Sequence, residues 1–187
     1  MENKSAISDL KILLGVSGGV AVYKAVDLAS KLTAKGAQVH TIMTENALKF
    51  VLPKSFEAVT SRPVHTSMWD NVKDFEIGHI SLAQICDLVV VAPATANIIG
   101  KMACGICDDL LSTTLCACWQ KKLLLAPAMN DKMWTNPSVQ RNIESLKAAG
   151  VSIIGPEKGR LACGTEGVGR MSEPADIVKR LEQMMTK

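Results

Sequence analysis

Short apolar runs alternate with longer amphipathic stretches along most of the chain. Five runs have the length and composition of buried strands: residues 11–16, 37–43, 88–92, 123–126 and 151–154. The stretches between them place apolar side chains at helical spacing, and residues 21–35 carry Val22, Val26, Ala29 and Leu32 on one side. This alternation predicts an α/β fold in three layers, with a doubly wound parallel sheet.

The other expected helices are shorter or less regular. They cover residues 79–86, 96–102, 109–119, 138–149 and 174–185. Thr44 is a candidate N-cap for one further helix. Residues 51–78 contain prolines and a glycine that interrupt any long period, so we expect short elements and a mobile loop there. Residues 155–172 hold five glycines and are expected to form a loop.

The composition fits one domain of ordinary size, residues 1–187, with an aliphatic core. Hydrophobic residues make up 48% of the chain, aromatic residues make up 4%, and the net charge is +3. The charge is spread along the chain, so we expect no nucleic-acid partner. No apolar run approaches the roughly 20 residues of a membrane-spanning helix, and the first ten residues lack a signal-peptide core. We therefore expect no membrane partner.

The six cysteines lie in or beside apolar segments, a distribution that favours a reducing cytoplasm over a disulfide scaffold. The spacings of Cys104 with Cys107 and of Cys116 with Cys118 suggest zinc or a redox dithiol. Zinc sites of this kind need C-x-x-C pairs on tight turns, whereas these cysteines alternate with apolar residues in helical sequence. We interpret them as small buried side chains and predict no metal site.

Three of the expected strands are followed by turns that suit a ligand. Residues 15–19, rich in glycine, join the first strand to a helix N-terminus, where backbone N–H groups attract a phosphate. The turn matches neither the G-x-G-x-x-G pattern nor a Walker A loop, so it suits a mononucleotide phosphate better than a pyrophosphate. A tight turn without a ligand is the alternative. Thr44 and residues 93–97 end two other strands, and strand ends facing one way favour a common pocket.

The fourth apolar strand stops near Pro127, and Asn130 follows between Met129 and Met133. An amide among apolar side chains at a strand end can orient a carboxylate or a ring edge and keep water away. The alternative is a turn asparagine, with the methionines and Trp134 in the core.

Three further side chains are candidates for chemistry. Cys163 lies in a glycine-rich loop, where a thiol could approach a ligand and leave; the alternative is a loop cysteine without a function. His79 follows Gly78 and precedes an apolar segment, so it could face a cleft. His40 lies in an expected strand and is interpreted as structural.

Together these motifs resemble the flavin-dependent cysteine decarboxylases, and within them the enzymes that act on 4′-phosphopantothenoylcysteine. The resemblance runs from Lys11 to about Pro174 and rests above all on residues 127–134 and the loop around Cys163. It implies a Rossmann-like flavoprotein that binds FMN. It also implies a homo-oligomer, a homotrimer or a homododecamer, with active sites between subunits. In many bacteria this domain is fused to a synthetase that makes its substrate.

The resemblance also implies roles for individual residues. Three are catalytic: His79, Asn130, which would hold the substrate carboxylate, and Cys163, which would donate a proton after decarboxylation. The residues implied to contact FMN are Gly15, Ser17, Gly18, Gly19, Thr44, Ala94, Thr95, Asn97 and Met129. The residues implied to contact the substrate are Asn130, Met133, Ala162, Cys163 and Gly164. Gly19 and Thr95 stand where many relatives carry serine, so hydroxyl contacts to FMN would differ at these two positions.

The implied activity is that of a lyase of coenzyme A biosynthesis in the cytoplasm, which decarboxylates 4′-phosphopantothenoylcysteine to 4′-phosphopantetheine. Oxidation of the thiol carbon to a thioaldehyde, with FMN as hydride acceptor, creates an electron sink. Loss of carbon dioxide then produces an enethiolate, which is protonated and reduced. The alternatives are a peptidyl-cysteine decarboxylase, an enzyme like the flavin prenyltransferases, and, in another class, an FMN electron carrier. The electron carrier leaves Asn130 and Cys163 unexplained.

Overall fold

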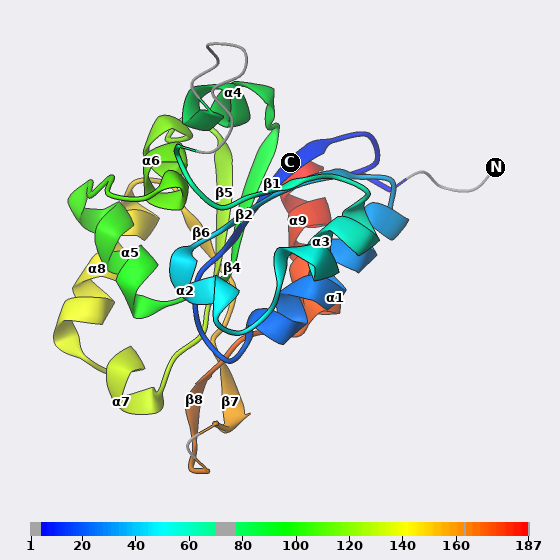
Figure 1. Ribbon diagram of the computed structural model, residues 1–187. Helices are drawn as coiled ribbons and strands as arrows, with labels where there is room; N and C mark the ends of the chain where they lie inside the picture. The colour runs from blue at the N-terminus through cyan, green and yellow to red at the C-terminus, as the bar shows by residue number, and fades with distance from the viewer. Residues whose placement is uncertain (1–4, 70–77, 163, 187) are drawn as a thin grey trace.

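The computed structural model describes residues 5–69, 78–162 and 164–186. At its centre lies a six-stranded sheet of parallel strands in the order β3-β2-β1-β4-β5-β6 (Figure 1). The strands are β1 (Lys11–Val16), β2 (Gln38–Met43), β3 (Val64–His65), β4 (Leu88–Ala94), β5 (Lys122–Pro127) and β6 (Ser152–Ile153). The strand order reverses between β1 and β4, so the predicted doubly wound parallel sheet is confirmed.

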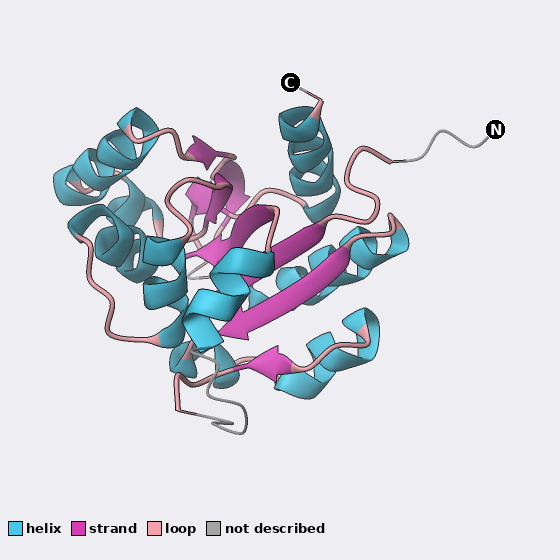
Figure 2. Ribbon diagram, turned by 90° about the horizontal axis from the view of Figure 1, so that it is seen from above, coloured by secondary structure: helices cyan, strands magenta, loops and turns pink. Residues whose placement is uncertain are grey.

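Helices cover both faces of the sheet, as the view from above shows (Figure 2). On one face lie α1 (Val22–Ala34), α3 (Pro53–Thr60) and α9 (Pro174–Met185). On the other lie α4 (Gly78–Ile85), α5 (Ala96–Cys104), α6 (Leu110–Ala117) and α8 (Pro137–Ala148). Two single-turn helices, α2 (Glu45–Leu48) and α7 (Asp131–Trp134), follow β2 and β5. None of the helices in the described ranges has the length and apolar character needed to cross a membrane.

The central strands are buried on both faces, which explains why their sequences are continuous apolar runs. Successive side chains of a strand point to opposite faces. Leu88 and Val90 of β4 accordingly join the core cluster under α1 and α9, whereas Val89 and Val91 join the cluster under α5 and α6. The three layers predicted from the sequence follow from this double burial.

Residues 51–69, the described part of the region before α4, hold two elements that the hydrophobic pattern did not specify. The sequence predicted five strands, but β3 is a sixth; its two residues are too short for a detectable period. Helix α3 lies in the same region, so the prediction of short elements there is confirmed. The predicted mobile loop includes residues 70–77, which lie outside the described residues.

The prediction that residues 155–172 form a loop is wrong. Strands β7 (Glu157–Arg160) and β8 (Glu166–Arg170) pair as an antiparallel hairpin below the main sheet (Figure 1). A side chain on Gly169 would overlap the carbonyl oxygen of Met129, and a Cβ on Gly167 would lie 2.6 Å from the Cβ of Asp131. These glycines therefore do not mark a loop; they let β8 pack closely against the segment that follows β5.

The interpretation of the paired cysteines as buried side chains is wrong for three of the four. Cys104, Cys107 and Cys116 are exposed; Cys118 is buried, and its Sγ lies 3.8 Å from that of Cys86. Cys104 and Cys116 lie in α5 and α6 but on sides that do not face the core, whereas Cys107 lies in the turn between the two helices. All five of these thiols are free.

Candidate active site

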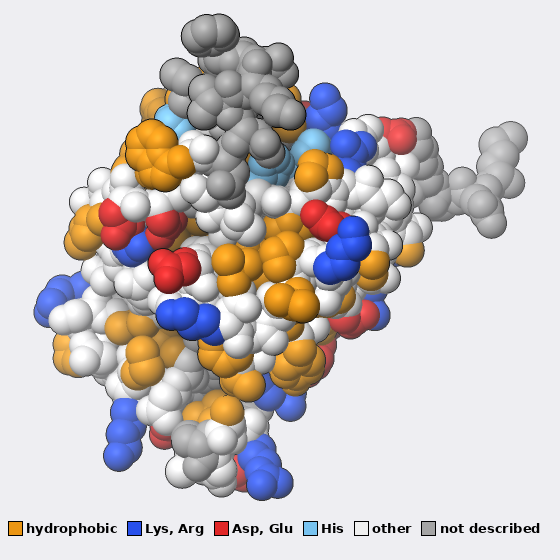
Figure 3. Space-filling model, viewed as in Figure 1, with side chains coloured by type: hydrophobic (Ala, Val, Ile, Leu, Met, Phe, Trp, Pro, Cys, Tyr) orange, Lys and Arg blue, Asp and Glu red, His pale blue; other side chains and the backbone are white. Residues whose placement is uncertain are grey.

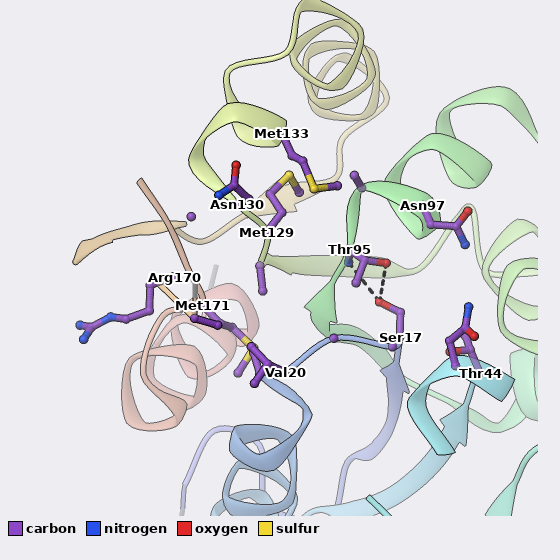
Figure 4. A pocket seen from close by; sticks show the side chains of 18 of the residues that line it. Ser17, Val20, Thr44, Thr95, Asn97, Met129, Asn130, Met133, Arg170 and Met171 are labelled. Atoms are coloured by element: carbon purple, nitrogen blue, oxygen red, sulfur yellow. Dashed lines mark hydrogen bonds between the residues drawn. The ribbon is translucent and has the colours of Figure 1, made fainter. Parts of the chain in front are cut away.

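A cavity of about 1030 Å³ lies at the carboxyl edge of the main sheet. It is lined by the turns that follow β1, β2, β4 and β5 and by residues of the β7–β8 hairpin (Figure 4). This is the point where the strand order reverses, the usual ligand site of doubly wound folds. Ligand pockets commonly measure about 300–1,000 Å³, so the cavity has room for a mononucleotide and a second molecule.

The turn after β1 presents an anion-binding surface. Residues 18–21 line the cavity directly before α1, and their backbone N–H groups donate no hydrogen bond within the described part of the chain. Helix α1 has no side-chain N-cap and no acidic residue in its first turn. Unsatisfied amide donors at the positive end of a helix attract phosphate. The turn therefore fits the phosphate of a mononucleotide, as the sequence predicts.

Ser17 fastens this turn to the turn after β4. Its hydroxyl donates to the carbonyl oxygen of Pro93 at 2.8 Å and accepts the backbone N–H of Thr95 at 3.0 Å. The Ser17 and Thr95 hydroxyl oxygens are also 3.0 Å apart (Figure 4). Because Ser17 is 2% exposed and its hydroxyl is already engaged, its side chain positions the two turns.

Most of the residues predicted to contact FMN line this cavity: Ser17, Gly18, Gly19, Thr44, Thr95, Asn97 and Met129. Gly15 and Ala94 are not among the lining residues. Gly15 lies inside β1, where a Cβ would meet Leu111 at 2.6 Å, and Ala94 is fully buried. The hydroxyl of Thr44 accepts the N–H of Ala47, which confirms its predicted role as an N-cap.

The segment after β5 forms the facing wall. Asn130 is the N-cap of α7, and its Oδ1 accepts the N–H of Lys132 at 2.9 Å. Met129 and Met133 lie beside it (Figure 4). The N–H of Met129 donates to the carbonyl oxygen of Gly169 at 2.9 Å, which holds the hairpin next to Asn130. The cap fixes the orientation of the Asn130 amide among apolar side chains at the cavity wall.

The remaining predicted site residues are placed less uniformly. Ala162 and Gly164 line the cavity, while Cys163 between them lies outside the described residues. His79 is in the first turn of α4 and is not among the described residues that line the cavity. In Figure 1, α4 lies at the top and α7 at the bottom. One chain therefore does not bring His79 to Asn130.

Sequence reasoning missed the charged side chains of the cavity. Lys101 lies 2.6 Å from both Asp108 and Asp109. Burial acts to lower the pKa of Lys101, but its hydrogen bonds to the two carboxylates outweigh this effect and raise the pKa. The hydrogen bond from Lys101 likewise holds the pKa of Asp108 below its ordinary value. Lys101 and Asp108 are therefore both charged at neutral pH, and each has its partner within the cluster. A second charged group consists of Lys24, Arg160 and Arg170.

Comparison with known proteins places the chain in a family. The family model described as Flavoprotein matches residues 1–186. This chain belongs to the flavoprotein family. The flavoprotein is 48% identical over 177 residues to the coenzyme A biosynthesis bifunctional protein CoaBC of Bacillus subtilis, covering 95% of this chain and 43% of CoaBC. It is 42% identical over 173 residues to CoaBC of Escherichia coli K12, covering 92% of this chain and 42% of that CoaBC. It thus spans less than half the length of these relatives.

Solved structures match the flavoprotein along nearly its whole length. A cysteine-to-serine mutant of PPC decarboxylase complexed with pantothenoylaminoethenethiol has a TM-score of 0.85 and 35% identity, covering 96% of this chain and 100% of that one. The FMN binding protein AtHal3 has a TM-score of 0.80 and 35% identity, and the match covers 94% of this chain and 96% of that one. The peptidyl-cysteine decarboxylase EpiD has a TM-score of 0.76 and 26% identity, and the match covers 90% of this chain and 96% of that one. The Rossmann-like flavoprotein fold implied by the sequence resemblance is confirmed.

Proposed function

We propose that residues 1–187 form a single FMN-binding domain that decarboxylates 4′-phosphopantothenoylcysteine to 4′-phosphopantetheine in coenzyme A biosynthesis. One observation carries this proposal: a single cavity has a phosphate-binding turn on one wall and the Asn130 amide on the other. The similarity to CoaBC and to a PPC decarboxylase supports the choice of substrate. A cytoplasmic location is part of the proposal and is supported by the free thiols of the five described cysteines.

The turns that follow β1 and β4 fit FMN. The N–H groups of residues 18–21 would hold its phosphate, and Thr95 and Asn97 would lie beside the rest of the molecule. Met129, on the facing wall, would contact FMN from the other side. When bound, FMN supplies a two-electron acceptor next to the substrate thiol. The side chain of Ser17 keeps the turns after β1 and β4 at a fixed separation, so this surface is formed before a ligand arrives.

Asn130 would hold the carboxylate that is lost. Its amide NH₂ group is a hydrogen-bond donor for a carboxylate, and its cap bond to α7 fixes the side chain in advance. Met129 and Met133 would keep water from the carboxylate. A charged group in an apolar site is poorly solvated, which favours its departure as neutral carbon dioxide.

Cys163 is the proposed proton donor to the enethiolate. Its neighbours Ala162 and Gly164 line the cavity, which supports the proposal that this loop reaches the substrate. The ligand named in the PPC decarboxylase mutant structure is an ethenethiol, the class of compound that remains when carbon dioxide has left and no proton has been added. A thiol suits this step because its pKa can lie close to neutral pH.

The active protein is proposed to be a homo-oligomer, a trimer or a dodecamer, in which His79 of one subunit completes the site of its neighbour. Support comes from the position of His79 outside its own chain's cavity. Large apolar side chains are also exposed near it: Ile80 and Ile85 on α4, and Trp119 after α6, which is 76% exposed. Apolar side chains show at this end of the molecule and across the middle of the same face (Figure 3). Such surfaces commonly bind other subunits.

The test is to add 4′-phosphopantothenoylcysteine to purified, FMN-loaded protein with its flavin absorbance band near ~450 nm. The proposal predicts one carbon dioxide for each 4′-phosphopantetheine formed. Carbon dioxide from a peptide with a C-terminal cysteine but not from this substrate would favour a peptidyl-cysteine decarboxylase. If carbon dioxide is released from neither compound, decarboxylation is contradicted and an FMN electron carrier is the remaining alternative. With Cys163→Ser the product should be lighter by two hydrogen atoms; the normal product at the normal rate would disprove the role of Cys163.

A further inference from the structure

The cavity continues into a smaller polar recess on the hairpin side. This recess measures about 370 Å³ and shares four lining residues with the main cavity: Tyr23, Lys24, Arg160 and Arg170. Its other lining residues are Asp27, Glu173 and Pro174. Arg170 points away from Ser17 and Thr95 and lies on the side of Asn130 (Figure 4). We call this hollow the basic recess.

Positive charge exceeds negative charge in the basic recess. Glu173 lies 2.8 Å from Lys24 Nζ and 3.7 Å from the guanidinium of Arg170. Asp27 is paired at 2.6 Å with a lysine of its own helix that is not part of the lining. Arg160 makes no ion pair within the described part of the chain. The Glu173 carboxylate is therefore shared by Lys24 and Arg170, and the Arg160 guanidinium is available to bind an anionic ligand.

The hairpin brings these arginines together beside the proposed substrate wall. The guanidinium carbon of Arg170 lies 3.5 Å from where a Cβ on Gly159 would be, directly next to Arg160 in the chain. On the same strand, the carbonyl oxygen of Gly169 accepts the N–H of the residue before Asn130. A molecule bound at Asn130 would therefore lie beside the hairpin that also carries the two arginines of the basic recess.

We propose that the basic recess binds the 4′-phosphate of the substrate and that Arg160 gives the enzyme its preference for the phosphorylated compound. This inference rests on the proposed decarboxylation. A phosphomonoester carries about −1.5 to −2 charges at pH 7, which complements the excess positive charge. Arginine binds phosphate through two parallel hydrogen bonds. With its carboxylate at Asn130 and its phosphate in the recess, the substrate is fixed at both ends, which orients the cysteine.

FMN carries the other phosphomonoester that this cavity would receive. The backbone N–H groups of residues 18–21 already provide a phosphate site on the sheet wall, and this leaves the basic recess to the substrate. A phosphate in the basic recess could come from FMN or from the substrate. The two are distinguishable because changing Arg160 should weaken the binding only of the molecule whose phosphate Arg160 contacts.

The experiment compares Arg160→Gln with Lys158→Gln, a matched change of an exposed cation on the same strand that lines neither hollow. For each FMN-loaded protein, kcat/KM is measured with 4′-phosphopantothenoylcysteine and with pantothenoylcysteine. In Arg160→Gln the ratio of the two kcat/KM values should fall by about 10- to 100-fold, the usual range for losing a charge-assisted hydrogen bond. Lys158→Gln should keep the wild-type ratio, and Arg160→Lys should recover part of it.

Binding to the apoprotein forms the second arm, with FMN and riboflavin titrated by flavin fluorescence. Arg160→Gln should leave the preference for FMN over riboflavin at its wild-type value; loss of that preference would assign the recess to the flavin phosphate and overturn the inference. Equal kcat/KM values for both substrates in the wild type would also overturn it, while leaving the decarboxylation intact. Failure of the wild type to release carbon dioxide from either substrate would overturn the proposed function itself.

Discussion

The two walls of the cavity are built in different ways. The sheet wall consists of turns at the ends of β1, β2 and β4, and the buried hydroxyl of Ser17 joins two of them. The hairpin wall consists of α7 and the β7–β8 pair, which lie outside the main sheet. A backbone hydrogen bond from Met129 to Gly169, and the absence of side chains on Gly167 and Gly169, hold that wall in place.

This difference indicates a division of labour. The position of the sheet wall follows from two apolar cores, so it provides a rigid surface for a cofactor that stays bound. The hairpin wall depends on a few close contacts and carries exposed charged side chains. Changes to the sheet wall should therefore alter flavin binding and stability, whereas changes to the hairpin wall should alter turnover in a folded, flavin-loaded protein.

The largest effect is expected from Asn130→Asp. Aspartate caps a helix as well as asparagine does, so α7 should persist. The new carboxylate removes the NH₂ donor and repels the substrate carboxylate, so kcat/KM should fall by roughly 100-fold or more. The matched control is Asn136→Asp, at the N-cap of α8, which should keep its activity. Near wild-type turnover in Asn130→Asp, with a normal flavin spectrum, would show that Asn130 is only a cap.

Mixed oligomers test whether the hairpin wall is completed by another subunit. His79→Asn and Asn130→Asp should each be inactive alone. Random mixing should restore activity to about a quarter of the possible sites, because each site then takes one intact residue from each of two subunits. The measurement is carbon dioxide release after the two proteins are unfolded and refolded together. If refolded mixtures are as inactive as the separate variants, His79 acts within its own chain or not at all.

A smaller loss is expected from Gly169→Ala. Its methyl group would overlap the carbonyl oxygen of Met129, so β8 must move away from the segment that holds Asn130. Activity should fall by about 10- to 100-fold, since small misplacements at a reacting centre cost this much. FMN affinity should be retained. In the control Gly159→Ala, the nearest atoms to the new methyl belong to the Arg170 side chain at 3.5 Å, an ordinary van der Waals contact, so activity should change little. Equal losses in the two variants would count against close packing as the cause.

The smallest effect on turnover is expected from Ser17→Ala, which acts on the sheet wall. It leaves the N–H of Thr95 without its partner and removes one of the two donors to the Pro93 carbonyl oxygen, which keeps the backbone N–H of residue 17 at 3.4 Å. The expected cost is about 1–3 kcal/mol in unfolding free energy. FMN affinity should fall by about tenfold as the two turns separate. Thr114→Val removes a buried hydroxyl that bonds only within its own helix and serves as the control. If both variants lose FMN affinity equally, the effect of Ser17 is one of general stability.

The sequence specified the sheet wall better than the hairpin wall, for a physical reason. Strands buried on both faces must be apolar throughout, so β1, β4 and β5 could be located, and the glycine turn after β1 follows from them. The hairpin alternates charged residues with glycines, which hides a strand. The need for Gly169 arises from contact with Met129, 40 residues earlier in the chain, and no local pattern records it.

The site residues divide in the same way. Asn130 could be predicted because it follows a strong strand, and its role as an N-cap became visible only with α7 in place. Arg160 and Arg170 could not be predicted, because only the pairing of β7 with β8 brings them to one recess. The family resemblance named His79, but the position of α4 at the far end of the sheet depends on how the whole chain folds.

The division between the walls is tested most directly by amide hydrogen exchange, measured on the apoprotein, the FMN-loaded protein, and the loaded protein with 4′-phosphopantetheine. FMN alone should slow exchange at residues 18–21, whose N–H groups otherwise have no partner in the described chain. Adding 4′-phosphopantetheine should then slow exchange in α7 and in the β7–β8 hairpin. Protection of the hairpin by FMN without protection of residues 18–21, or no further protection by 4′-phosphopantetheine, would contradict the account.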